Sequence, residues 1–344
     1  MYQIREAVYA TSFPTKATTR SWTTTLLLFD AIVTKGLNTN SYKFALWRAL
    51  ANLAPDTDQK RPNISKQQLA PLFLNYYWPL EVKFHIRQGI DPNKDPIVMK
   101  RIRQLLNVGT ITHGETLKDF QRRMPKEHKI LVEGIARQAF DDVIPRFHIV
   151  HGKQIDPRIF TFTGKPGKAG DEIELTNDGR QFLIDYQDLI DYVAVSGWVR
   201  FTEQFTSAPR LHDKIAGTRV KRGAVSQWRD LLRVMQNGKC FYDETHDMAS
   251  SEVDHVLPWS FVLEDRTWNL VLACRNCNNG KRDRLTNMDA LERLCARNEQ
   301  IAKGHKGASR NFLRHFAEWH SRDLSSHIKG LYDQAVADKF PTWK

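Results

Sequence analysis

Apolar residues recur at helical spacing through much of the first 150 residues, which predicts a mainly helical region. One apolar-rich segment covers 42–53. A second, over 64–77, begins behind Asn63 and Ser65, which are both good helix-capping residues. We expect Pro79 to end this second helix, because proline disrupts a helix interior.

A third helix is expected over 96–106, with an apolar face and a basic face. The two faces consist of Ile97, Met99, Ile102 and Leu105, and of Lys100, Arg101 and Arg103. An aromatic cluster, Tyr76–Trp78, lies between the second and third segments. Core packing is the ordinary explanation for such a cluster, and a base-stacking surface is the alternative.

The pattern changes after residue 150, where short strand-like runs appear. Ile159–Phe162 and Glu172–Leu175 flank a turn-rich loop, which predicts a small β-hairpin. The loop contains two Gly-Lys pairs, but the G-x-x-x-x-G-K-[ST] spacing is absent, so we exclude a phosphate loop. A helix over 179–194, capped by Thr176 or Asn177, is expected next.

A basic stretch over 200–233 precedes the last third of the chain. We expect a linker at 216–223 and a helix from Ser226. The basic charge here indicates either a solvated surface or an approach that contacts phosphates. The sequence leaves both interpretations open.

Two capped helices are expected near the end of the chain. Asn287 precedes one, with Leu291, Leu294, Cys295 and Ile301 on its apolar side, and Asn311 precedes another, with Phe312, Phe316 and Trp319. The predicted fold class is therefore mainly α (α+β). A helical domain with a small hairpin is expected over 1–220, and a second domain with C-terminal helices over 221–344.

Composition and charge narrow the function classes. The formal net charge is +12, which suits a polyanionic partner such as DNA, and both predicted domains are net positive. No apolar run is long enough to span a membrane, and the first residues lack the apolar region of a secretion signal. A cytoplasmic protein without a membrane partner is expected.

All four cysteines lie in the last third: Cys240, Cys274, Cys277 and Cys295. Without a secretion signal, such clustering indicates metal binding or redox chemistry rather than a disulfide framework. Cys295 falls on the apolar face of its predicted helix, so we expect it to be a buried core thiol.

The stretch from Cys240 to Leu285 combines an Asp-His pair, an Asn-Leu pair and a C-x-x-C followed by Asn and Lys. This pattern resembles the HNH endonuclease family, which has a ββα-metal fold. The matching residues are Val253, Asp254, His255, Val256, Pro258, Asn269, Leu270, Cys274, Cys277, Asn278 and Lys281. The match covers about an eighth of the chain and has Asn at the last position, as an H-N-N variant.

The resemblance implies a catalytic set of His255, Asp254, Asn269 and Asn278. Histidine suits the general base that deprotonates water, because its ordinary pKa is near neutrality. Asp254 and Asn278 would hold one divalent ion, Mg²⁺ or Mn²⁺, through oxygen ligands. Asn269 would pin the loop and help to orient His255.

The resemblance also implies DNA as the substrate. Lys281 and Arg282 are expected to contact its phosphates, helped by the amides at the start of a helix.

A structural Zn²⁺ is also expected, because two C-x-x-C pairs hold zinc in many family members. Here Cys274 and Cys277 form one pair, while the other is reduced to Cys240, with Asp243 in the second position. Asp243 or His246 could complete the site. Three free cysteines in a reduced core are the alternative.

Two other functions compete with the nuclease. A catalytically inactive zinc-ribbon module would bind nucleic acid without cutting it, and a thioredoxin-like redox pair would use the C-x-x-C alone. The favoured biological role is bacterial defence or restriction, beside other subunits of such a system. A recruitment, sensing or DNA-binding role is expected for 1–220.

Overall fold

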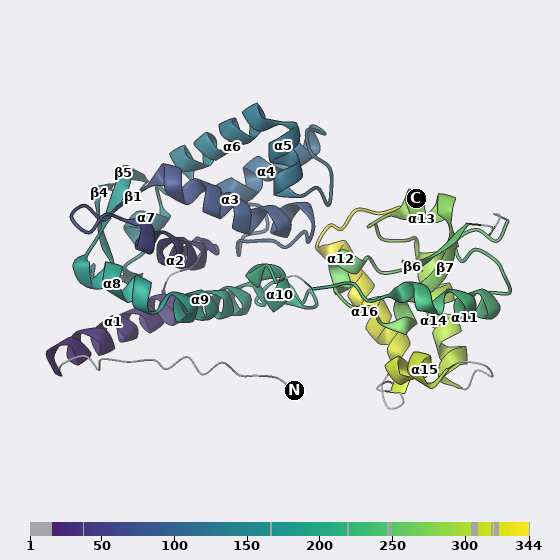
Figure 1. The fold of residues 1–344 in the computed structure, drawn as a ribbon. Coiled ribbons are helices and arrows are strands. Elements are labelled where there is room, and N and C mark those ends of the chain that lie inside the picture. The colour runs from purple at the N-terminus through teal and green to yellow at the C-terminus, as the bar shows by residue number, and fades with distance from the viewer. Residues whose placement is uncertain are drawn as a thin grey trace, which may run out of the picture. The chain divides into compact units, whose positions relative to one another are not determined.

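The computed structural model describes residues 16–36, 38–165, 167–218, 220–245, 248, 250–303, 309–317, 319 and 323–343 (Figure 1). The chain divides into two compact units. Unit 1 comprises 1–38, 42–70 and 136–197, and unit 2 comprises 39–41, 71–135 and 198–344. The predicted division at residue 220 remains a prediction.

The elements are helices and a few short strands, and helices predominate, as the sequence predicts. Up to residue 202 they are α1 (Lys16–Lys35), α2 (Tyr42–Leu53), η1 (Ala54–Asp56), β1 (Asn63–Ser65), α3 (Lys66–Val82), α4 (Ile97–Asn107), α5 (Leu117–Arg123), α6 (Pro125–Gln138), α7 (Val143–Arg146), β2 (Ile149–Val150), β3 (Lys153–Gln154), β4 (Phe160–Lys165), β5 (Lys168–Leu175), α8 (Asn177–Asp185) and α9 (Gln187–Thr202). They continue with α10 (Leu211–Ala216), η2 (Val225–Trp228), α11 (Arg229–Met235), β6 (Ser251–His255), α12 (Trp259–Val262), η3 (Thr267–Asn269), β7 (Leu270–Cys274), α13 (Arg275–Lys281), α14 (Met288–Ala302), α15 (Arg310–Ala317) and α16 (Leu324–Ala337).

Unit 1 is built around buried aromatic side chains. Trp47 of α2 is completely buried, with its ring centroid 4.7 Å from that of Phe29 in α1 and 4.8 Å from that of Phe147. Phe147 in turn lies 5.0 Å from Phe160 of β4. These contacts join α1, α2 and the small sheet into one core.

The predicted hairpin is present as β4 and β5, and a third strand joins it. The sheet order is β1-β5-β4, with Ile64 of β1 opposite Ile173 of β5, both buried. The sequence predicted residues 63–65 only as a helix cap. The expected helix over 179–194 is two helices, α8 and α9, which meet at Tyr186.

Helix α3 does not end at Pro79, contrary to the prediction, but continues to Val82. Because proline has no backbone N–H, Pro79 leaves the carbonyl of Asn75 without its helical hydrogen bond. Asn75 is exposed, so water can reach this carbonyl instead. Trp78 is buried, stacks on Phe120 at 5.0 Å and donates its indole N–H to the backbone of Glu115. Tyr77 is buried too, so core packing explains these two aromatics.

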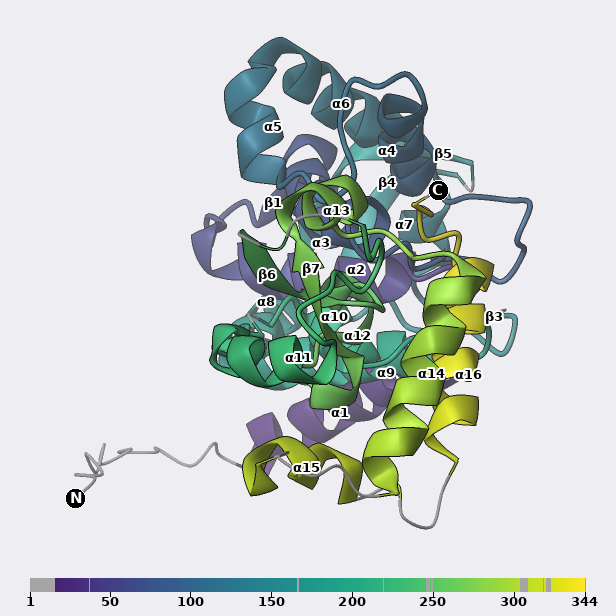
Figure 2. The ribbon, with the colours of Figure 1, turned by 90° about the vertical axis from the view of Figure 1, so that its right-hand side faces the viewer.

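The C-terminal part of unit 2 has its own hydrophobic core, to which β6, β7 and α14 contribute. Helices α14 and α16 pack side by side along it (Figure 2). The Asn287 side chain caps α14 as predicted, by accepting the N–H of Ala290. Cys295 of α14 is buried in this core, also as predicted. The helix expected from Ser226 is the short η2 followed by α11.

A search through the described residues finds no helix with the length and apolarity needed to cross a membrane.

Candidate functional site

Strands β6 and β7 form an antiparallel hairpin, and α13 follows β7 directly and packs against both strands (Figure 2). Asp254 pairs with Val271, and His255 with Leu270. Successive side chains of a strand point to opposite faces, so Glu252 and Asp254 share one face of β6. The segment is thus a ββα unit with the Asp-His pair at the end of its first strand.

The Asp254 carboxylate is held by two donors. The Tyr242 hydroxyl donates to it at 2.6 Å, and the Lys281 ammonium lies 3.2 Å away. Burial, and then the neighbouring Asp254 charge, raise the pKa of Tyr242 well above its ordinary value, so this hydroxyl stays a donor. The Asp254 side chain is still 11% exposed, which leaves part of its carboxylate accessible.

Lys281 is an internal clamp rather than a surface cation. Its ammonium is completely buried and donates to the main-chain oxygen of His255 at 2.6 Å, in addition to pairing with Asp254. The predicted phosphate contact by Lys281 is therefore wrong for this structure, because an ammonium buried in this way does not reach a phosphate. Arg282, the next residue, is exposed.

Asn278 lies on α13, one turn before Lys281. Its side-chain amide donates to the Glu252 carboxylate, which shares a face of β6 with Asp254. The amide nitrogen therefore faces Glu252. An amide oxygen is a ligand that hard cations accept. Glu252 was not predicted, because an isolated Glu in a strand carries no motif.

His255 is held by a carboxylate that the sequence did not single out. Its Nε2 lies 2.9 Å from an oxygen of Asp265, and its side chain is only 7% exposed. Burial raises the pKa of Asp265, but hydrogen bonds from His255 and the Gly223 amide, with the charge of Arg222, outweigh burial and lower it. The ionised carboxylate only accepts, so Nε2 is the donor in this bond. In a neutral imidazole with this tautomer, Nδ1 is the nitrogen with the lone pair that a base needs.

Asn269 ties the two ends of the hairpin together. Its buried side chain accepts the N–H of Leu257 at 2.8 Å and donates to the Leu257 carbonyl at 2.9 Å. The main-chain oxygen of Asn269 also accepts the Val256 N–H. These bonds fix the two residues that follow His255, which in turn limits the positions open to its ring.

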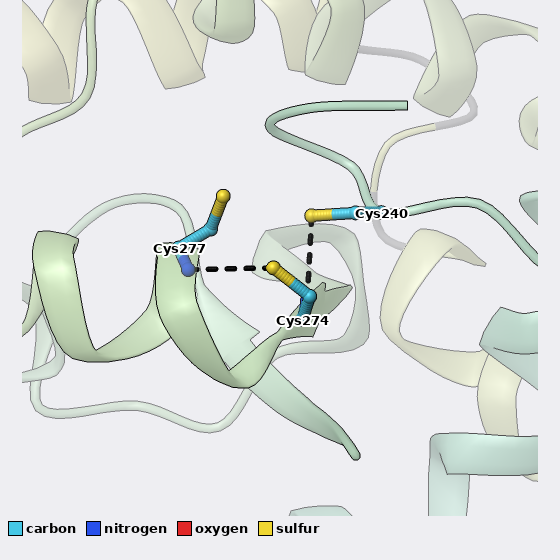
Figure 3. Close-up of side chains that lie close together, drawn as sticks. All are labelled: Cys240, Cys274 and Cys277. Carbon is cyan, nitrogen blue, oxygen red and sulfur yellow. Dashed lines mark hydrogen bonds between the residues drawn. The ribbon is translucent and has the colours of Figure 1, made fainter. Parts of the chain in front are cut away.

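Three cysteines meet beside the hairpin, and their ligand atoms all lie within 4.8 Å of one another. Cys274 ends β7, Cys277 lies in α13, and Cys240 comes from the preceding loop (Figure 3). The Cys274 N–H donates to the Cys240 sulfur, and the Cys277 N–H to the Cys274 sulfur. All three are buried, and their sulfur atoms are close enough together that the group could hold a zinc ion.

The predicted zinc ligand Asp243 is not part of the thiol group in this structure. Its carboxylate accepts the N–H and hydroxyl of Thr245 instead, at 2.9 and 2.6 Å, and does not join the thiol group. Aspartate makes such local turns readily, since its side chain reaches the backbone two residues on. The other predicted ligand, His246, lies outside the described residues.

We expect one zinc ion per chain, lost when Cys277 is replaced by serine. Removal of one thiolate leaves too few soft ligands, so elemental analysis of the purified variant should show roughly tenfold less zinc or lower still. Cys295→Ser is the matched control, because Cys295 is buried in the core away from the group. Equal zinc in all three proteins would contradict a site at these thiols.

The hairpin, the helix and the Asp-His pair together form a ββα unit of the kind that the sequence resemblance predicts. In agreement, residues 242–286 match the model of the HNH endonuclease family. The match contains the whole ββα unit, together with Tyr242 and Asp265. Neither the curated proteins nor the solved structures gave a match to the chain.

Proposed function

We propose that the chain is a metal-dependent endonuclease that hydrolyses DNA phosphodiester bonds at the ββα unit. The observation that supports this most strongly is the match of residues 242–286 to the HNH endonuclease family, which contains the Asp254–His255 pair. The net charge of +12 suits a polyanionic substrate.

His255 is the proposed general base. Asp265 holds its Nε2, Asn269 fixes the residues behind it, and Lys281 fixes its main-chain oxygen. With three constraints on one residue, Nδ1 stays oriented to accept a proton from water. Asp265 is a positioning residue in this scheme, since it acts through His255.

Asp254 and Asn278 are the proposed ligands of one divalent ion, Mg²⁺ or Mn²⁺. The donor set fits, because an accessible carboxylate and an amide oxygen are hard ligands that these ions prefer. Such an ion would neutralise charge that develops on the phosphate during cleavage. Lys281 and Tyr242 together hold the Asp254 carboxylate in place.

The test is cleavage of supercoiled plasmid by the purified chain. We expect nicked circles with Mg²⁺ or Mn²⁺ and none in a buffer without divalent ions, because cleavage needs the charge of the ion. Binding of DNA without cleavage in either ion would favour the inactive binding module instead. A role in bacterial defence or restriction remains a prediction, which cleavage of modified and unmodified DNA would address.

A further inference from the structure

A cavity of about 400 Å³ lies in unit 2, lined by residues that are far apart in sequence. They come from the end of α3 and the residues just after it, from the loop at 112–114, from the segment 279–284, which includes the end of α13, and from Pro341. Residues before position 135 therefore share a cavity with the ββα unit. Nothing in the proposed cleavage chemistry uses this cavity.

Positive side chains dominate the charged part of the lining: Lys83, Arg282 and Arg284 against Asp283. Lys83 packs against aromatic rings, with its ammonium 5.4 Å from the centroid of Trp259. Burial is the main cause that lowers the pKa of Lys83. The charge of Asp283 opposes it, and the charge of Arg222 adds a smaller lowering effect. A partly desolvated ammonium among other cations gains strongly from a bound anion.

Two uncharged histidines complete the polar lining. Burial is the main cause that lowers the pKa of His85, to about 3, and the pKa of His113 is lowered by burial too. Their rings lie 4.9 Å apart. Neutral imidazoles each offer one N–H donor, so the cavity combines cations with neutral donors, which is the chemistry that binds a phosphate ester.

Ring contacts and one electrostatic interaction connect the wall of this cavity with the surroundings of His255. Lys83 lies over the Trp259 ring, and the guanidinium of Arg222 lies 4.8 Å from the centroid of the same ring. The Arg222 charge also acts on Asp265, which holds His255. Arg222 therefore links the cation of the cavity wall, Lys83, with the carboxylate that holds His255.

We propose that this cavity is a phosphate-binding pocket, with Lys83 and Arg282 as its principal cations, that holds a backbone phosphate of the nucleic acid flanking the cleaved bond. The proposal rests on the proposed nuclease function. It also gives residues before 135 a direct part in substrate binding, in addition to any role in recruitment.

Binding without cleavage tests the pocket. In a His255→Ala background, the affinity for a labelled 20-base-pair duplex is measured between 50 and 200 mM salt. Lys83→Met should remove one phosphate contact, which makes the negative slope of log K against log salt shallower by about 0.9. The fold-loss of affinity between 50 and 200 mM salt should then be roughly threefold smaller than in the parent protein. Methionine keeps the apolar stem over Trp259.

Lys303→Met is the matched control, since Lys303 is exposed at the end of α14 and should leave the slope unchanged. Lys83→Arg should restore the slope. Arg282→Gln alters an exposed residue and gives a second test if Lys83→Met fails to fold.

The outcomes separate the two proposals. If Lys83→Met and Arg282→Gln bind the duplex as Lys303→Met does, the pocket proposal is overturned, even where the wild-type chain cuts DNA. If both variants have the shallower salt slope while the wild-type chain never cuts DNA, the phosphate-pocket proposal is supported and the nuclease proposal is contradicted. Calorimetry with inorganic phosphate and ATP distinguishes the source, because a Lys83 effect on ATP alone would overturn the assignment to a nucleic-acid backbone.

Discussion

Replacement of His255 by alanine is expected to lower the rate of plasmid nicking about 10²- to 10⁴-fold. The imidazole is the proposed base. Its Nε2 is engaged by Asp265, so Nδ1 is the nitrogen that would take the proton from water, and alanine offers no such atom. The measurement is the single-turnover rate of conversion of supercoiled to nicked DNA at saturating Mg²⁺. Because only the base is removed, we expect duplex affinity and zinc content to stay close to those of the wild-type chain.

His212→Ala is the matched control for this variant, because His212 is exposed on α10 and has no contact with the ββα unit among the interactions described. Its nicking rate should equal that of the wild type. His255→Asn keeps a polar group of similar shape and guards against a folding defect, since the His255 side chain is nearly buried. If a His255 variant nicks DNA at the wild-type rate, the assignment of His255 as the general base is contradicted.

Asp265 extends the same experiment to the residue that positions the base. Asp265→Asn alone should slow nicking about 10- to 100-fold, as expected when a histidine loses its orienting carboxylate. In the His255→Ala background the same substitution should have no further effect, because Asp265 acts only through His255. Additive losses would show instead that Asp265 has a separate structural role.

Much of the fold follows from local sequence patterns. The hairpin of β4 and β5, the Asn287 cap and the buried face of α14 were predicted, because each depends on residues a few positions apart. The predicted helix end at Pro79 was wrong. The free energy that a proline costs in a helix is offset here, because water can bond the exposed Asn75 carbonyl and the aromatic neighbours of Pro79 are buried. Strand β1 was missed because three residues carry too little periodicity.

The candidate site divides in the same way. Its core types and spacing were visible because the ββα unit is compact in sequence. The partners of those residues were not, since they depend on tertiary contacts: Asp265 lies in a loop ten positions from His255, and Tyr242 comes from before the hairpin. Asp243 looked like a zinc ligand from its place in the sequence, yet a local turn with Thr245 occupies its carboxylate.

Lys281 shows why burial must decide between two roles for one lysine. Sequence position favoured a phosphate contact, whereas its ammonium is enclosed between Asp254 and the His255 carbonyl. Lys281→Met is therefore expected to lower the free energy of unfolding by about 3–5 kcal/mol, because it leaves a mostly buried carboxylate without its cation. The lost hydrogen bond to His255 adds to this effect.

Urea unfolding, followed by tryptophan fluorescence, measures the loss of unfolding free energy. The buffer contains no magnesium, because a bound ion would compensate the Asp254 charge and stabilise the variant. Lys239→Met is the matched control, because Lys239 pairs with Glu244 at the shorter distance of 2.8 Å but at the exposed surface. Solvent screening makes such an exposed pair contribute little to the free energy of unfolding. Equal losses of unfolding free energy in the two variants would contradict the internal clamp, because burial would then make no difference to the contribution of the ion pair.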